Sequence, residues 1–166
     1  SLTKLAEEKL PAPLKQKVFE YCISSYKRKI FEGWDWHLGM LYIASKLTDK
    51  ESDADIILAY LESVNGNYER EKAQSFKLDL LKRFKDTKEV EEFISKHISN
   101  SKIRKQEIEK AFENKNFDRA IELAKDGIKC DEQSKPGLAK DWYDWLLKIA
   151  LTQNDTPNSI KYARRS

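Results

Sequence analysis

The residue types that hold transition metals occur at four positions in this chain, as Cys22, His37, His97 and Cys130. Zinc sites usually draw their ligands from pairs separated by about two to four residues, and none of these four has such a neighbour. His97 adjoins an apolar stripe and is predicted to be a half-buried structural histidine. We therefore predict no metal site and no cofactor.

One group of carboxylates lies at Glu51, Asp53 and Asp55. They fall at the start of a predicted helix, where negative charge complements the positive end of the helix dipole. This structural interpretation is preferred to the alternative, a divalent-cation site.

Nucleophilic catalysis requires a Ser or Cys beside a base that a third group orients. Neither Cys22 nor Cys130 lies in a glycine-rich turn, and each falls within a predicted helix or at its end. The phosphate-binding patterns GxxxxGK and GxGxxG are also absent from the sequence. We therefore predict that the protein is not an enzyme, and keep an enzyme without a recognisable motif only as a reserve hypothesis.

Basic residues cluster along the chain, although the net charge is only +3 and acidic residues neighbour most of the clusters. Nucleic-acid binding would require these clusters to converge on one face. The alternative is that they belong to separate, solvated helix faces. The residues whose shared face would favour nucleic-acid binding are Lys82, Arg83, Lys102, Arg104 and Lys105.

Aromatic residues crowd two short segments near Trp36 and Trp142. Consecutive helical residues point about 100° apart, so each crowd cannot bury all of its rings. Exposed Trp and Tyr are favoured anchors of protein interfaces. The alternative for each ring is core packing, and Trp142 and Trp145 share a face with Leu146. The predicted partner-binding residues are Trp34, Trp36, Tyr42, Trp142, Tyr143 and Trp145.

Composition indicates long helices in a folded protein. Charged residues make up 36% of the 166 residues, with only 5 Gly and 4 Pro to form turns. No apolar run approaches the roughly 20 residues that cross a bilayer, and the first residues lack the hydrophobic region of a secretory signal. The two distant cysteines give no disulfide framework. These features predict a cytoplasmic protein.

Hydrophobic periodicity predicts a series of amphipathic helices. Gly33 is expected to end the first helix, and Ser52 is expected to cap the third. Asn100-Ser101 is expected to end the fifth helix and to cap the sixth. Asn65-Gly66 is expected to close the third helix. The first five predicted helices span 12–32, 34–47, 52–64, 68–84 and about 87–98.

An internal repeat provides the most specific pattern in the sequence. Residues 107–131 are predicted to form two helices joined at Asn114–Asn116, with Ala120 and Ala124 on the buried face. A shift of 39 residues aligns AIELAKD (120–126) with SIKYARR (159–165) and NKN (114–116) with QND (153–155). A period of this length is typical of stacked helix hairpins. The aligned core pairs are Ile121/Ile160, Ala124/Ala163, Ile108/Leu147 and Ala111/Ala150.

The segment AFENKNFDRAIELA (111–124) resembles a tetratricopeptide unit, although Ala124 stands where an aromatic residue is common. The wider order of FEGWDWHLGMLYIASKL, NSKIR (100–104), NFDRAIELAKDGI and PGLAKDWYDWLLKIALTQND is similar to the helical region of bacterial SWIM-type zinc-finger proteins. That likeness covers about residues 30–165. The family's zinc pattern, CxC followed by CxH, is absent, so no metal ligand carries over. The resemblance implies a helical domain of a longer bacterial protein, consistent with Ser at position 1.

The sequence thus predicts one all-α domain over 1–166, a right-handed α-α superhelix of about ten helices. Residues 1–99 would form a less regular part and 101–165 two tetratricopeptide-like hairpins. The predicted function is a non-enzymatic protein-protein interaction or scaffold module that binds a protein or peptide and no membrane. The alternative is a nucleic-acid-associated accessory domain of a SWIM-type zinc-finger protein.

Overall fold

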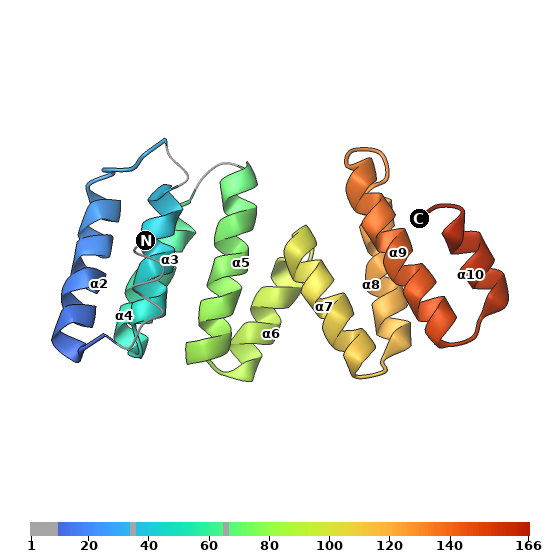
Figure 1. Ribbon diagram of the computed structural model, residues 1–166, viewed down its shortest axis with the longest axis horizontal. Helices are drawn as coiled ribbons and strands as arrows, with labels where there is room; N and C mark the ends of the chain where they lie inside the picture. Colours follow the sequence, from blue (N-terminus) through green and yellow to red (C-terminus); the bar gives the residue numbers. More distant parts are fainter. Residues whose placement is uncertain (1–9, 34–35, 65–66) are drawn as a thin grey trace. The chain divides into compact units, whose positions relative to one another are not determined.

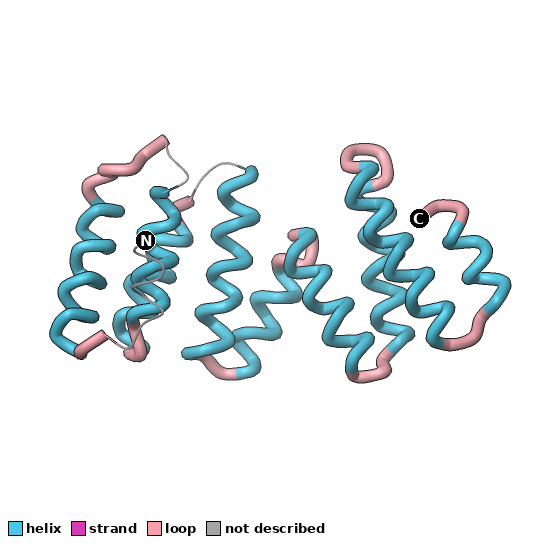
Figure 2. Tube along the Cα trace, in the orientation of Figure 1, coloured by secondary structure: helices cyan, strands magenta, loops and turns pink. Residues whose placement is uncertain are grey.

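A computed structural model describes residues 10–33, 36–64 and 67–166, and within these ranges every regular element is an α-helix (Figure 1). The predicted all-α class is therefore confirmed. The helices are joined by short loops in the described ranges (Figure 2). In chain order they are α2 (Ala12–Lys27), α3 (Trp36–Leu47), α4 (Glu51–Glu62), α5 (Asn67–Phe84), α6 (Thr87–Lys96), α7 (Ser101–Glu113), α8 (Phe117–Asp131), α9 (Pro136–Thr152) and α10 (Thr156–Ala163).

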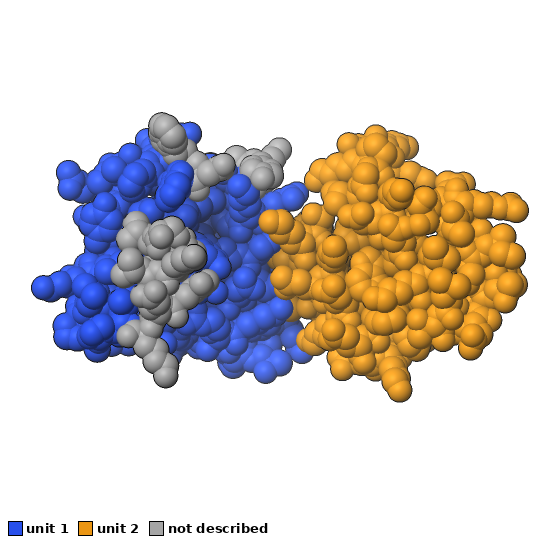
Figure 3. Space-filling view, viewed as in Figure 1, with its two compact units in different colours: residues 1–93 blue, residues 94–166 orange. Residues whose placement is uncertain are grey.

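The chain divides into two compact units, residues 1–93 and residues 94–166, which meet within α6 (Figure 3). We call them unit 1 and unit 2. The change from the less regular part to the hairpins was predicted near residue 100, a few residues after this boundary. Each unit has a hydrophobic core of its own.

In unit 1, α3 packs against α2, α4 and α5. Its sequence, WHLGMLYIASKL, is apolar around most of its circumference, as expected of a helix enclosed by neighbours. Met40, Leu41 and Ala44 on α3 are at most 1% exposed. Cys22 of α2 and Ile57 of α4 are 0% exposed in the same unit.

The first helix ends earlier than the sequence predicted. We expected it to continue to residue 32, but α2 ends at Lys27, and Lys29 takes a left-handed backbone conformation with φ 53°. The amide of Lys29 donates to the carbonyl of Tyr26, and that of Ile30 donates to the carbonyl of Ser25. These bonds satisfy the last carbonyls of the helix in the way a glycine C-cap usually does. The end was missed because lysine, not glycine, occupies the left-handed position.

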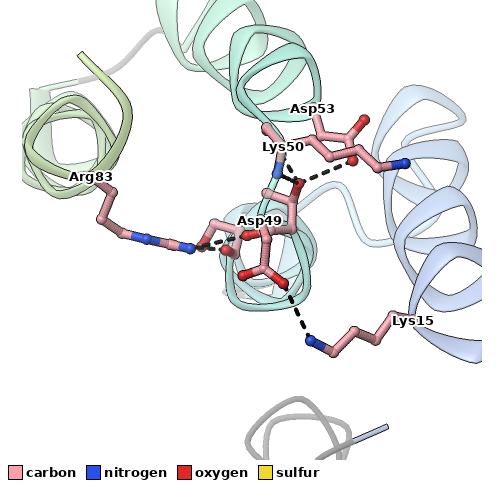
Figure 4. A network of polar contacts seen from close by, with 7 residues as sticks. Lys15, Asp49, Lys50, Asp53 and Arg83 are labelled. Carbon is pink, nitrogen blue, oxygen red and sulfur yellow. Dashed lines mark hydrogen bonds and ion pairs between the residues drawn. The ribbon is translucent and has the colours of Figure 1, made fainter. Parts of the chain in front are cut away.

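The junction of α3 and α4 is held by side chains (Figure 4). Arg83 of α5 donates through Nη1 to the carbonyl of Ser45 at 2.8 Å and through Nη2 to that of Thr48 at 3.0 Å. The guanidinium thereby pairs two carbonyls at the end of α3, where a positive charge is also favoured by the helix dipole. Arg83, predicted as a member of a basic cluster, has a structural role in capping another helix.

The start of α4 corrects the predicted cap. Ser52 was expected to cap this helix, but α4 begins at Glu51 with no side-chain cap from its N-cap residue, Lys50. The hydroxyl of Thr48 instead accepts from the amide of Lys50 at 3.1 Å and donates to Asp53 Oδ2 at 3.0 Å. The two other carboxylates of this cluster, Glu51 and Asp55, pair with Lys85, the residue that follows α5, at 2.7 and 2.8 Å.

In unit 2, successive helices from α7 to α10 run in opposite directions (Figure 1). Each packs against the next, and α7 also contacts α9. Asn100 caps α7 by accepting from the amides of Lys102 and Ile103, which confirms the predicted break. The turn predicted at Asn114–Asn116 lies between α7 and α8, as expected.

The two hairpin turns of unit 2 repeat at the predicted distance of 39 residues. Lys115 and Asn154 both take left-handed conformations, with φ 58° and 57°. The next residue donates its amide five residues back in each turn, from Asn116 to Ala111 at 2.8 Å and from Asp155 to Ala150 at 2.9 Å. The internal repeat is therefore a repeat of backbone geometry as well as of sequence.

Each turn also ends in the same side-chain cap. Asn116 accepts from the amide of Arg119 at 3.3 Å, and Asp155 accepts from that of Asn158 at 3.1 Å. Hydrogen bonds from the Asn158 side chain and backbone lower the pKa of the Asp155 carboxyl below its ordinary value.

Replacing Asn116 by alanine should lower the free energy of unfolding of unit 2 by about 1 kcal/mol, because the first turn of α8 loses its cap. Urea unfolding followed by far-UV circular dichroism measures the change. Asn116→Asp is the matched control, since aspartate caps as well as asparagine and should stay within about 0.5 kcal/mol of the parent. Equal losses in both variants would show that the cap does not stabilise the turn.

The helices that follow the two hairpin turns, α8 and α10, differ in which aligned residues are buried. Ala111 and Ala150 are both buried, as aligned, but Ala124 is 0% exposed whereas its counterpart Ala163 is exposed. Ile160 is likewise 53% exposed. The reason is that α8 packs against both α7 and α9, while α10 packs mainly against α9.

Candidate functional site

The predicted aromatic anchors of unit 1 lie on the surface where they are described. Trp36 is 56% exposed and Tyr42 is 42% exposed, whereas Trp34 lies outside the described residues. Tyr42 packs edge-on against Phe76, with ring centroids 5.8 Å apart, and the ammonium of Lys46 lies 5.1 Å from its ring. Six helical positions separate Trp36 from Tyr42, so these side chains leave α3 in directions about 120° apart.

The three aromatic residues of α9 point in different directions. Tyr143 is half-buried, and its hydroxyl donates to Glu132 Oε1 at 3.3 Å, with the Arg165 guanidinium 5.9 Å from its ring. Trp145 is half-buried and packs edge-on against Phe112 of α7, with ring centroids 5.9 Å apart. Sequence reasoning placed these residues in one candidate set, and the structure separates them.

Trp142 must be removed from the predicted partner-binding residues, because it is only 1% exposed. Its indole Nε1 donates to Asp131 Oδ2 at 2.8 Å, which satisfies the buried donor. The ring lies directly on α8, where a Cβ added at Gly127 would come within 2.8 Å of it. Trp142 is therefore part of the core of unit 2.

A hollow of about 290 Å³ lies between α7 and α9, and we call it the α7/α9 groove. From α9 it receives a stripe at positions 141, 144, 145 and 148, and from α7 the positions 105 and 109. These spacings of three and four residues place each set on one helix face. The lining residues are Lys105, Glu109, Asp141, Asp144, Trp145 and Lys148.

Trp145 is the one aromatic residue that lines this groove, and it belongs to a cluster of rings. Phe112 packs edge-on against Trp145 and also against Phe117, whose centroid is 5.6 Å away. The ammonium of Lys148 lies 4.6 Å from the centroids of both Phe112 and Trp145. Lys148 thus covers the two rings with a cation, an attraction worth about 0.5–1 kcal/mol at exposed sites.

Charged groups of both signs border the rings. Glu109, Asp141 and Asp144 contribute carboxylates, and Lys105 contributes a further ammonium. Asp144 accepts a hydrogen bond from the hydroxyl of Ser166. None of the groove's lining residues is a Ser, Thr, Cys or His, so the lining includes no hydroxyl, thiol or imidazole group. The groove therefore presents one tryptophan ring among charged side chains of both signs.

Two of the five basic residues that were predicted to discriminate nucleic-acid binding have structural contacts. Arg83 caps α3, and Arg104 is only 3% exposed. Arg104 lies beside Asp131 and Trp142 in the core of unit 2, so its charge cannot face a phosphate backbone. The sequence missed the Arg104–Asp131 contact because it joins α7 to the end of α8 across the hairpin.

The candidate metal ligands do not come together in the described residues. No group of three His, Cys, Asp or Glu there could hold a metal ion. Cys22 is buried, which raises the pKa of its thiol to about 11, and His37 stacks on Tyr26 with centroids 4.1 Å apart. His97 is half-buried, as predicted. No helix in the described ranges is both long and apolar enough to cross a membrane.

Comparison of the chain with known protein families, curated proteins and solved structures gives no match.

Proposed function

We propose that this protein is a non-enzymatic interaction module built from tetratricopeptide-like helix hairpins, and that a protein or peptide segment binds in the α7/α9 groove. The observation that carries this proposal is the half-buried Trp145 within that groove, which packs edge-on against Phe112 and is bordered by charges. Trp is among the residues most enriched at the centres of protein interfaces. The 39-residue repeat of the hairpin turns supports a stacked-hairpin architecture.

The groove suits a chain segment better than a small molecule or a nucleic acid. Its volume of about 290 Å³ is at the lower end of ligand pockets, so it accommodates one or two side chains of a partner. Three of its five charged lining residues are carboxylates, which would repel the phosphates of DNA or RNA. A partner segment would place an apolar side chain against Trp145 and polar groups against the rim.

The proposal predicts that Trp145→Ala weakens partner binding at least about tenfold, the loss of a central aromatic anchor. Peptides are first selected from a random display library on the purified full chain, and their dissociation constants are then measured by fluorescence anisotropy. Tyr42→Ala, which removes an exposed ring of unit 1, is the matched control and should leave these constants unchanged. If the selected peptides bind Trp145→Ala as tightly as the parent, the groove is not the binding site.

A further inference from the structure

Arg104 is a buried guanidinium with too few hydrogen-bond acceptors. It is 3% exposed, and it lies where α7 meets the end of α8 and the Trp142 ring. A guanidinium carries five N–H donors and is always charged. Its only acceptor at hydrogen-bonding distance in the described structure is a sulfur, Cys130 Sγ, 3.8 Å from Nη2.

The neighbouring carboxylate of Asp131 does not supply the missing hydrogen-bond acceptors. Asp131 Oδ2 lies 3.8 Å from Arg104 Nη1, which is an ion-pair distance but too long for a hydrogen bond. That oxygen already accepts from Trp142 Nε1 at 2.8 Å. The Nε and Nη1 groups of Arg104 are buried and lack a hydrogen-bond partner in the described residues. Because a thiol is a weak acceptor, the guanidinium retains unused donors, with Nη2 against Cys130 and Nη1 beside Asp131.

Cys130 differs from the other cysteine in its access to solvent. Cys130 is exposed, although its sulfur contacts Arg104, whereas Cys22 is 0% exposed in the core of unit 1. A small polar reagent can therefore reach the Cys130 thiol from solvent and cannot reach Cys22 without unfolding. Cys130 is thus an exposed cysteine whose sulfur contacts the buried guanidinium of Arg104, and the buried Cys22 serves as an internal control.

We propose that Cys130 is a site of oxidation by hydrogen peroxide, and that Arg104 holds the anionic product. In the first step the thiolate sulfur attacks one peroxide oxygen, the O–O bond breaks, and the departing hydroxide takes a proton to form water. The sulfur has then lost two electrons and carries a sulfenate oxygen. A second peroxide reacts in the same way and gives the sulfinate.

The oxidised Cys130 supplies the hydrogen-bond acceptors that Arg104 lacks in the reduced protein. Each new S–O bond places a hard, negatively charged acceptor on the sulfur that already contacts Nη2. Charge-assisted bonds from a guanidinium to a two-oxygen anion are strong and geometrically matched. Oxidation should therefore satisfy the buried donors of Arg104 and stabilise unit 2, whereas oxidation of an ordinary exposed cysteine would leave stability unchanged.

The test treats the full chain with hydrogen peroxide and locates added oxygen by peptide mass mapping. Two oxygen atoms should appear on Cys130 and none on Cys22. Thermal unfolding of the oxidised protein should then show a Tm about 4 °C higher than that of the reduced protein, the shift expected when one buried donor is satisfied. An unchanged or lower Tm at full Cys130 oxidation would overturn the proposal, as would preferential oxidation of Cys22.

Two variants distinguish stabilisation of the oxidised Cys130 by Arg104 from oxidation that follows only from the exposure of Cys130. Arg104→Lys keeps the charge but loses the fork of donors, so peroxide should raise its Tm by less than half as much as in the parent. Cys130→Ser should gain no oxygen at position 130 and should show no peroxide-dependent Tm change. Should Arg104→Lys fail to fold, the comparison of oxidised and reduced parent chain decides the matter alone.

Discussion

Replacing Asp131 by alanine is expected to destabilise unit 2 by about 3–5 kcal/mol, the usual cost of breaking a buried ion pair from one side. The carboxylate is 8% exposed, accepts from the Trp142 indole, and lies 3.8 Å from the guanidinium of Arg104. Its removal leaves a buried cation without a counter-charge and a buried indole N–H without an acceptor. Urea unfolding of the full chain, followed by tryptophan fluorescence and by hydrogen exchange of unit 2 amides, measures the loss.

A double-mutant cycle separates the two parts of this effect. Asp131→Asn keeps an oxygen that can accept from Trp142 but loses the charge, so it should cost less than Asp131→Ala. Arg104→Met combined with Asp131→Ala removes the cation that the single Asp131→Ala variant leaves unpaired. The double variant should therefore lose at least about 1 kcal/mol less free energy of unfolding than the sum of the two single losses. Additive losses in the cycle would mean that Arg104 and Asp131 do not interact energetically.

This buried contact also shows where prediction from the sequence ends. Helix positions in unit 2 follow from periodicity because each apolar stripe is local, and the turn at Asn114–Asn116 follows from the repeat. The Arg104–Asp131 pair joins residues 27 positions apart, and both residues have types that usually lie on the surface. Their burial depends on how α7 and α8 pack, which a one-dimensional pattern does not specify.

For the same reason, the sequence could predict only part of the candidate site. The sequence placed Trp142 and Trp145 on one apolar face, with core packing as the alternative for each ring, but it could not indicate that Trp145 and Tyr143 are only half-buried or which ring faces α7. Trp142 was wrongly included among the partner-binding residues, because its burial depends on a contact with α8 that periodicity in α9 alone does not reveal. One local signal was present: Gly127 lies in the interior of a predicted helix, which often indicates a packing reason such as close approach by another group.

Gly127→Ala is expected to destabilise unit 2 by about 1–3 kcal/mol, the cost of overpacking a well-filled core. An added Cβ would lie 2.8 Å from Cδ1 and Nε1 of Trp142 and 2.9 Å from its Cγ. The rigid indole cannot move aside freely, because its Nε1 is fixed by the hydrogen bond to Asp131. The loss is measured by urea unfolding of the full chain.

The matched control is Gly39→Ala, which changes the same residue type within α3. A Cβ at Gly39 meets no atom within 4 Å, so the substitution should stabilise unit 1 by about 0.5–1 kcal/mol through higher helix propensity. The two glycines should thus respond with opposite signs. A gain in stability at Gly127 as well would show that α8 and the Trp142 ring are separated by more than a methyl group, and that Trp142 is not fixed against α8.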